Sequence, residues 1–165
     1  VDQMGTAYCI DPKANRILWK TSPEGEQARG CNTSSPCVVR GRMFYGTTAG
    51  RLHILDAASG KVLRSIDVGW PITGSPTAAN DSIYFQDLGA IIHCLDLDGN
   101  ERWRWDHYSQ YEDPKTNKRA TGFPGSWHDR HYGGGEVAVS GKRVVANLGW
   151  DLFCLLDDGD SARLD

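Results

Sequence analysis

The chain has 165 residues, of which 39% are hydrophobic and 24% are charged, and its formal net charge is −3. Its 18 basic and 21 acidic residues are spread along the whole length, so no basic stripe favours nucleic acid or an anionic membrane surface as a partner. The sequence shows no run of about 20 apolar residues, no signal peptide and no lipid anchor, so we expect no membrane segment in it.

The first predicted element is a β-hairpin over residues 5–21, and three further segments repeat its pattern. In each of the four, an aromatic residue or His, a small apolar residue and Leu or Ile follow one another in the same register. The central position is occupied in turn by Cys9, Ile54, Cys94 and Cys154, at spacings of 45, 40 and 60 residues. The last of these spacings equals one unit of about 40 residues plus an insertion of about 20.

A second landmark recurs at the same spacing and adds two strands to each unit. Residues 34–46 align without a gap with residues 74–86 and again with residues 134–146. Each of these segments contains a strand, a turn with Gly, Asn or Asp, and a second strand. Together with the hairpin that follows each of them, they predict units of four strands over residues 36–68, 76–106 and 135–165.

Units of about 40 residues with four antiparallel strands predict an all-β fold made of β-propeller blades. No long apolar stripe of helical period is found, so helices should be few, and the in-register repeat disfavours a β-sandwich. A closed ring would need roughly 250 to 350 residues. The chain therefore accounts for about half a propeller, with the hairpin 5–21 as the outer part of a first blade. We expect a fragment of a longer polypeptide, or part of a split or oligomeric ring.

The repeated residues resemble the pyrroloquinoline-quinone (PQQ) type propeller repeat, of which the chain would contain three to four copies. The resemblance covers nearly the whole chain. This repeat is shared by PQQ-dependent dehydrogenases, by scaffolds similar to the outer-membrane assembly lipoprotein BamB, and by sensor domains, so the fold alone does not choose among them. The matching positions are Ser75-Pro76, Tyr45-Gly46-Thr47, Asp56, Gly60, Lys61, Trp19 and Trp103.

The resemblance implies structural roles for two repeated residue types. The Trp, represented by Trp19 and Trp103, packs between adjacent blades. The Asp, represented by Asp11, Asp56 and Asp96, fixes the turn that follows it. These aspartates are expected to lie away from the propeller axis, so a structural role outweighs a catalytic one.

The chain departs from the family pattern in three ways. Arg64 replaces the Trp in one blade and Leu156 replaces the Asp in another, so we expect these blades to be held more loosely by their neighbours. PQQ-dependent alcohol dehydrogenases of the family carry a vicinal disulfide against the cofactor, whereas this chain has no adjacent Cys pair. We therefore expect no cofactor and assign no catalytic, cofactor-binding or metal-binding residue. The alternative is PQQ with calcium.

The five cysteines fall into two groups. Cys9, Cys94 and Cys154 occupy one repeat position, which favours small buried hydrophobic side chains over a cluster. Cys31 and Cys37 flank a loop that leads into a strand. They either close a small disulfide in an oxidising compartment or remain two unpaired thiols.

Residues 107–133 form an insertion with more aromatic residues than a solvated linker needs. We expect this segment to bind a partner, because Trp, Tyr and Arg are enriched at the centres of interfaces. Two alternatives remain: the segment folds back over its own blade, or its His residues bind a metal ion. A second candidate is Trp70, which either packs between blades or forms the floor of a ligand site. The partner-binding candidates are Trp127, His128, Arg130, His131 and Tyr132.

The sequence favours a non-enzymatic propeller that acts as a protein–protein interaction scaffold within a larger exported protein or complex. Its partners would be other protein subunits or the remainder of the propeller, with no nucleic acid. Its location would be the bacterial periplasm or the extracellular space, with any membrane association made through other parts or partners. The alternative is a segment of a PQQ-dependent quinoprotein dehydrogenase, an oxidoreductase.

Overall fold

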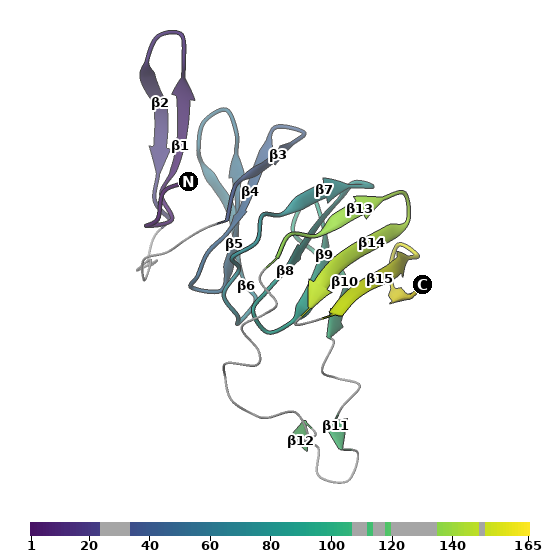
Figure 1. Cartoon of the computed structure of the whole chain (residues 1–165). Coiled ribbons are helices and arrows are strands. Elements are labelled where there is room, and N and C mark those ends of the chain that lie inside the picture. The colour runs from purple at the N-terminus through teal and green to yellow at the C-terminus, as the bar shows by residue number, and fades with distance from the viewer. Residues whose placement is uncertain (24–33, 107–111, 114–117, 120–134, 149–150) are drawn as a thin grey trace.

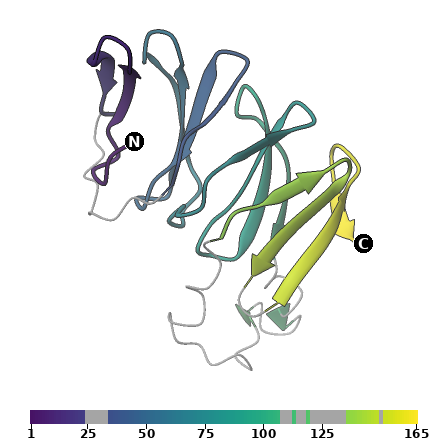
Figure 2. The ribbon, with the colours of Figure 1, turned by 45° about the horizontal axis from the view of Figure 1, so that its top comes forward.

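The computed structural model describes residues 1–23, 34–106, 112–113, 118–119, 135–148 and 151–165. Every regular element in these ranges is a β-strand, and the strands form a row of antiparallel sheets that face one another (Figure 1). Figure 2 shows the sheets spread like a fan, as blades are around a propeller axis. The predicted all-β fold with blades of four antiparallel strands is confirmed.

We number the blades 1 to 4 in chain order. Blades 2, 3 and 4 have four strands each, hydrogen-bonded in sequential order, and blade 1 has two described strands. Blade 1 contains β1 (Ala7–Asp11) and β2 (Arg16–Thr21). Blade 2 contains β3 (Cys37–Val39), β4 (Arg42–Gly46), β5 (Arg51–Asp56) and β6 (Val62–Asp67). Blade 3 contains β7 (Thr77–Ala79), β8 (Ser82–Gln86), β9 (Ile91–Asp96) and β10 (Glu101–Asp106). Blade 4 contains β13 (Ala138–Ser140), β14 (Arg143–Leu148), β15 (Asp151–Asp157) and β16 (Ala162–Leu164).

The three four-stranded blades repeat one pairing register between their second and third strands. Equivalent cross-strand pairs are Phe44 with Ile54, Tyr84 with Cys94, and Val145 with Cys154. The first strands of neighbouring blades are joined by side chains: the Ser75 hydroxyl accepts the Ser35 N–H at 3.1 Å, and the Thr77 hydroxyl donates to the Val137 carbonyl at 2.6 Å. These bonds hold the inner strands of successive blades side by side.

In blades 2 and 3, the turn between the first two strands has a left-handed backbone. Arg40 and Gly41 have φ angles of 47° and 74°, and Asn80 and Asp81 have φ angles of 49° and 54°. Two successive residues with positive φ form a turn whose twist matches that of the flanking strands. Gly, Asn and Asp tolerate this conformation, whereas a residue such as Arg40 rarely adopts it.

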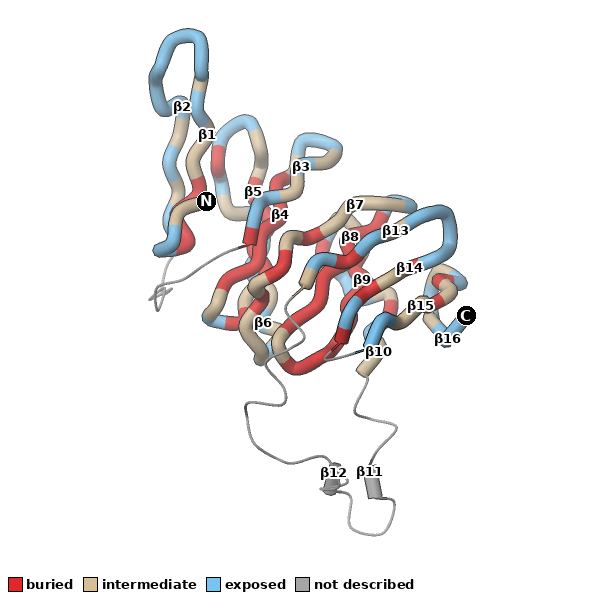
Figure 3. The backbone as a smooth tube through the Cα atoms, in the orientation of Figure 1, coloured by how far each residue is buried: buried red, intermediate tan, exposed pale blue. Residues whose placement is uncertain are grey.

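The hydrophobic core lies between the blades, as the buried stretches of β4, β5, β8 and β9 show (Figure 3). One cluster joins blades 2 and 3 and includes Phe44 and Phe85; another joins blades 3 and 4 and includes Tyr84 and Leu155. The outward faces of the first and last blades are open, because Ile10 is 59% exposed and Leu152 is 75% exposed.

Within the predicted insertion, the structure describes two short strands, β11 (Glu112–Asp113) and β12 (Lys118–Arg119), which pair antiparallel. Within the ranges that the structure describes, no helix has the length and apolar character needed to cross a membrane.

Candidate functional site

One end of the blades carries the connections between successive blades, and we call it the insertion end. β10 ends there at Asp106, and the chain resumes there at Gly135, ahead of β13 (Figure 1). The connection 68–76 between blades 2 and 3 and the turn 87–90 lie at the same end. The predicted insertion therefore departs from and returns to a surface that is already built by inter-blade loops.

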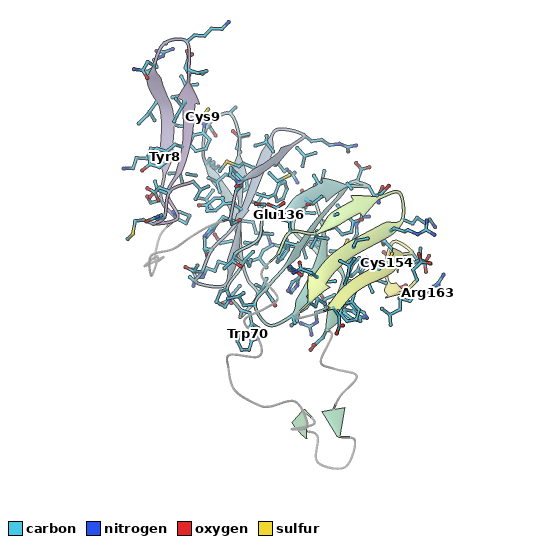
Figure 4. The ribbon with its side chains drawn as sticks, viewed as in Figure 1. Tyr8, Cys9, Trp70, Glu136, Cys154 and Arg163 are labelled. Carbon is cyan, nitrogen blue, oxygen red and sulfur yellow. The ribbon has the colours of Figure 1, made fainter. Side chains whose placement is uncertain are left out.

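Trp70 lies at the insertion end, against the turn of the next blade (Figure 4). A Cβ atom on Gly89 would lie 2.6 Å from Cδ1 of Trp70, so only a glycine leaves room for the indole. The Leu88 N–H donates to the Pro71 carbonyl at 2.8 Å, which ties the two loops together. This packing agrees with an inter-blade role for Trp70.

A buried Asp–His pair shapes the turn under Trp70. Asp87 is 0% exposed, and its Oδ1 accepts the backbone N–H groups of Gly89 at 2.8 Å and Ile91 at 3.2 Å. Its Oδ2 lies 2.9 Å from Nε2 of His93, whose ring stacks on Phe85 at 4.7 Å. Both carboxylate oxygens therefore hold the turn and the third strand of blade 3 in place. Neither residue was singled out from the sequence, because no motif marks the pair.

Gln86, next along the chain, has a buried amide whose two polar atoms find no hydrogen-bond partner among the described residues. The side chain is 1% exposed. A Cβ atom on Gly135 would lie 2.9 Å from its Nε2, so the amide faces the point where the chain returns from the insertion. An unmatched buried amide costs about 1–3 kcal/mol, which makes this position favourable for an added polar group.

The predicted partner-binding residues Trp127, His128, Arg130, His131 and Tyr132 lie outside the described residues, and their role stays a prediction. The same holds for Cys31 and hence for its disulfide. Cys37 is half-buried and forms no disulfide with another cysteine of the described ranges. Burial raises the pKa of its thiol.

The cysteines of the repeat position differ in their surroundings. Cys94 is buried between blades 3 and 4, and this burial raises the pKa of its thiol to about 11. Cys9 and Cys154 are half-buried.

The repeated aspartates lie at the opposite end of the blades, which we call the turn end. Asp56 accepts the hydroxyl of Ser59 at 2.6 Å and its N–H at 2.7 Å, and these bonds hold the pKa of the Asp56 carboxyl below its usual range. Asp96 accepts the backbone N–H and the side-chain amide N–H of Asn100. Burial alone would raise the pKa of the Asp96 carboxyl, but the hydrogen bonds have the larger effect and lower this pKa. Asp11 accepts the N–H groups of Lys13 and Ala14 in the turn that follows it.

The Trp residues of the repeat reach across to the next blade. The Trp19 indole N–H donates to the Ala57 carbonyl at 3.1 Å and its ring packs on Gly60, although the side chain is only half-buried. The Trp103 indole is 5% exposed and donates to Oδ1 of Asp157 at 3.0 Å. Arg64 takes the same place between blades 2 and 3 and donates to the carbonyl of Asp98 at 3.0 Å.

The expected looseness of the blade that carries Leu156 is wrong. Leu156 does occupy the Asp position by register, since it lies opposite Arg143. The next residue, Asp157, is instead buried between the blades and accepts the Tyr84 hydroxyl at 2.5 Å as well as the Trp103 indole. Burial, followed by the hydrogen bond to Asp157, raises the pKa of Tyr84 well above its usual range. A displaced carboxylate therefore joins blade 4 to blade 3.

Residues 3–147 match the family model of the outer membrane protein assembly factor BamB. The chain belongs to the BamB family. Two curated relatives are quinohemoprotein alcohol dehydrogenases of Pseudomonas putida. ADH-IIG is 28% identical, and the match covers 66% of this chain and 17% of the relative. ADH IIB is 27% identical, and the match covers 78% of this chain and 22% of the relative.

Solved structures confirm the propeller fold of this BamB-family chain. BamB from Moraxella catarrhalis has a TM-score of 0.66 at 14% identity, with 98% of this chain and 43% of that chain covered. Quinohemoprotein alcohol dehydrogenase ADHIIG from Pseudomonas putida has a TM-score of 0.76 at 19% identity, with 99% and 31% covered. The chain thus spans about a fifth of the curated relatives and less than half of these structures.

The sequence leaves PQQ with calcium as an alternative, and the two curated relatives are named quinohemoproteins. Within the described part of this BamB-family chain, no three His, Cys, Asp or Glu side chains gather into a group that could hold a metal ion. The buried carboxylates Asp87 and Asp157 are bonded to turns and to neighbouring strands. These carboxylates are engaged within the sheets, and the expectation of no cofactor stays a prediction.

Proposed function

We propose that the chain is part of a non-enzymatic β-propeller scaffold that binds a partner protein at the insertion end. In this proposal the surface consists of the insertion 107–133 and the loops 68–76 and 87–90, which lie at the same end. The protein would work in the bacterial periplasm or outside the cell, without a cofactor of its own. Membership of the BamB family supports an assembly role, because the family is described by an outer membrane assembly factor.

The observation that carries this proposal is how the buried polar groups are hydrogen-bonded. Asp87 and Asp157 are the buried carboxylates of the described residues, and each is fully engaged by hydrogen bonds that shape turns or join blades. A general base needs a carboxylate or His that is free to reach a substrate. The amide of Gln86, by contrast, is buried beside Gly135 with no hydrogen-bond partner among the described residues, and it favours an added polar group there.

A deletion tests the partner-binding role. In the full-length protein, residues 107–133 are replaced by a short Gly-containing turn, which long surface loops tolerate at small entropic cost. We expect an unchanged circular dichroism spectrum and loss of a co-purifying partner. A deleted protein that folds and keeps every partner would refute the proposal, and one that unfolds would show that the segment belongs to the core.

Single substitutions locate the binding residues within the insertion. Trp127→Ala, Arg130→Ala and Tyr132→Ala should each reduce partner recovery more than Lys118→Ala, a control in the same segment, because truncated aromatic and Arg side chains at interface centres have the largest effects. Equal recovery for all four variants would contradict these residues as the binding centre.

The alternative function, a segment of a quinoprotein dehydrogenase, is favoured by the similarity to the two alcohol dehydrogenases. It is tested by adding PQQ and calcium to the full-length protein and recording the quinone absorbance and the reduction of a dye with alcohols. A stoichiometric, active holoprotein would establish the dehydrogenase in place of the scaffold.

A further inference from the structure

A groove runs between blades 2 and 3 at the turn end, opposite the insertion. It consists of three adjoining cavities of about 420, 250 and 210 Å³, and Leu97 lines all three. The groove begins beside Val39 and Ala78 on the inner strands and ends beside Leu63 on the outer strand β6. It therefore crosses the full width of blade 2.

The groove follows from the departure of Arg64 from the repeat. At the neighbouring interface between blades 3 and 4, the equivalent Trp103 is 5% exposed and fills the space between the outer strands. At the groove, the Arg64 guanidinium instead reaches outward to the carbonyl of Asp98 and to Oδ1 of Asn100, at 3.0 and 2.9 Å. The 210 Å³ cavity that remains is lined by three apolar side chains and by three charged ones: Ile54, Leu63, Leu97, Arg42, Arg64 and Asp98.

Charges in the groove are only partly matched. Arg40 pairs with Asp81 at 2.5 Å, and Arg42 pairs with Asp98 at 2.6 Å. The carboxylate of Asp96 is bonded to the backbone and amide of Asn100.

Two guanidinium groups remain without a carboxylate. Arg64 and Arg102 form no ion pair among the described residues, and Arg102 makes one long bond of 3.4 Å to the carbonyl of Asp81. Each keeps N–H groups in the arrangement that binds a carboxylate through two parallel hydrogen bonds. One cavity lies beside Arg102 and another beside Arg64, and Leu97 lines both of them.

We propose that this groove binds a short extended segment of a partner protein, in which two acidic side chains flank an apolar one. Blade 2 has three strand spacings, which is about 14 Å, or roughly four extended residues. Alternate side chains of an extended segment point to one side, so the matching pattern is acidic, any, apolar, any, acidic. The acidic groups meet Arg102 and Arg64, and the apolar group meets Leu97. This surface is separate from the insertion end and does not depend on the proposed function.

The test is fluorescence anisotropy of the full chain with the labelled peptide Gly-Glu-Ser-Leu-Ser-Glu-Gly. The decisive variant is Arg64→Trp, which restores the residue of the repeat and fills the cavity. We expect Arg64→Trp to weaken peptide binding by about tenfold or more while the melting temperature stays equal or rises. The matched control is Arg163→Trp, an exposed Arg in blade 4, which should change binding less than twofold.

A second variant, Arg102→Gln, removes a charge without filling the groove and decides the matter if Arg64→Trp fails to fold. It should weaken binding by about tenfold and reduce the dependence of binding on salt. The proposal is overturned if the peptide does not bind at about 1 mM, or if folded groove variants bind it as the unmodified chain does. Equal binding of a peptide with Lys in place of Glu, or of a single-stranded DNA octamer, would also overturn it.

Discussion

The interfaces on the two sides of blade 3 use one repeat position in opposite ways. Between blades 3 and 4, Trp103 is buried and its indole meets the carboxylate of Asp157. Between blades 2 and 3, Arg64 is exposed and contacts the rim of the next turn, with cavities beside it. The strands on either side have the same register, so one backbone repeat supports a contact filled by an indole and a groove beside an exposed Arg64.

The largest effect on stability should come from the interface between blades 3 and 4. Trp103→Ala is expected to lower the free energy of unfolding by about 3–5 kcal/mol, because a large buried side chain is truncated. Urea denaturation measures the change, and Trp105→Ala, a half-buried Trp on the same strand, should cost less. Equal losses for the two variants would mean that Trp103 does not seal the interface.

The buried carboxylate should contribute the next largest effect. Asp157→Leu leaves the Tyr84 hydroxyl and the Trp103 N–H without their acceptor, at about 1–3 kcal/mol for each unmatched group. Asp158→Leu, which removes an exposed partner of Arg163, is the control and should cost less than about 1 kcal/mol. If both variants unfold at the same urea concentration, the carboxylate does not hold blade 4 to blade 3.

The interface between blades 3 and 4 should also respond to alkaline pH. Because burial and the bond to Asp157 raise the pKa of Tyr84, the folded state keeps a proton that the unfolded state releases above pH 10.0. Stability should therefore be complete below pH 10 and fall above it, by up to about 1.4 kcal/mol per pH unit for this group.

Tyr84→Phe removes this dependence, so its unfolding free energy should fall less steeply than that of the unmodified chain between pH 10 and pH 11.5. Denaturation series at each pH provide the comparison. Parallel curves would show that Tyr84 titrates equally in both states.

The smallest effect on stability is expected at the interface between blades 2 and 3. Arg64→Ala should change the free energy of unfolding by less than about 1 kcal/mol, since its hydrogen bonds are exposed to solvent. A loss as large as that of Trp103→Ala would mean that both interfaces are sealed, and the contrast between them would disappear.

The blades could be predicted from the sequence because strand order and register depend on patterns within a single repeat. The recurrence of residues 34–46, 74–86 and 134–146 was sufficient to predict three four-stranded sheets. Contacts between blades were harder to predict, because they depend on side chains from two repeats. Asp157 shows the difficulty: the loss of Asp at Leu156 suggested a weak blade, and the compensating carboxylate one residue later is visible only when Tyr84 and Trp103 are placed beside it.

The candidate site likewise combines features that can be predicted from the sequence with features that cannot. The position of the insertion follows from the repeat length, and both of its anchor points lie at one end of the blades as that length implies. The amide of Gln86, which has no hydrogen-bond partner among the described residues, carries no signal in the sequence, since Gly135 beside it lies in the next repeat. The groove likewise carries no signal in the sequence, because Arg64 in place of Trp predicts a weaker contact and not an open space.

The exposed faces of blades 1 and 4 have a consequence for how copies of this chain would associate. Leu152 is 75% exposed although its equivalent in blade 3, Ile92, is fully buried, whereas blade 1 presents Ile10 on a sheet of two described strands. These two faces are unlike, so they cannot form a self-complementary pair about a two-fold axis. A contact between two such faces is therefore head-to-tail, whichever polypeptide provides the facing blade, and a series of such contacts closes into a ring or grows into a filament according to the rotation at each step.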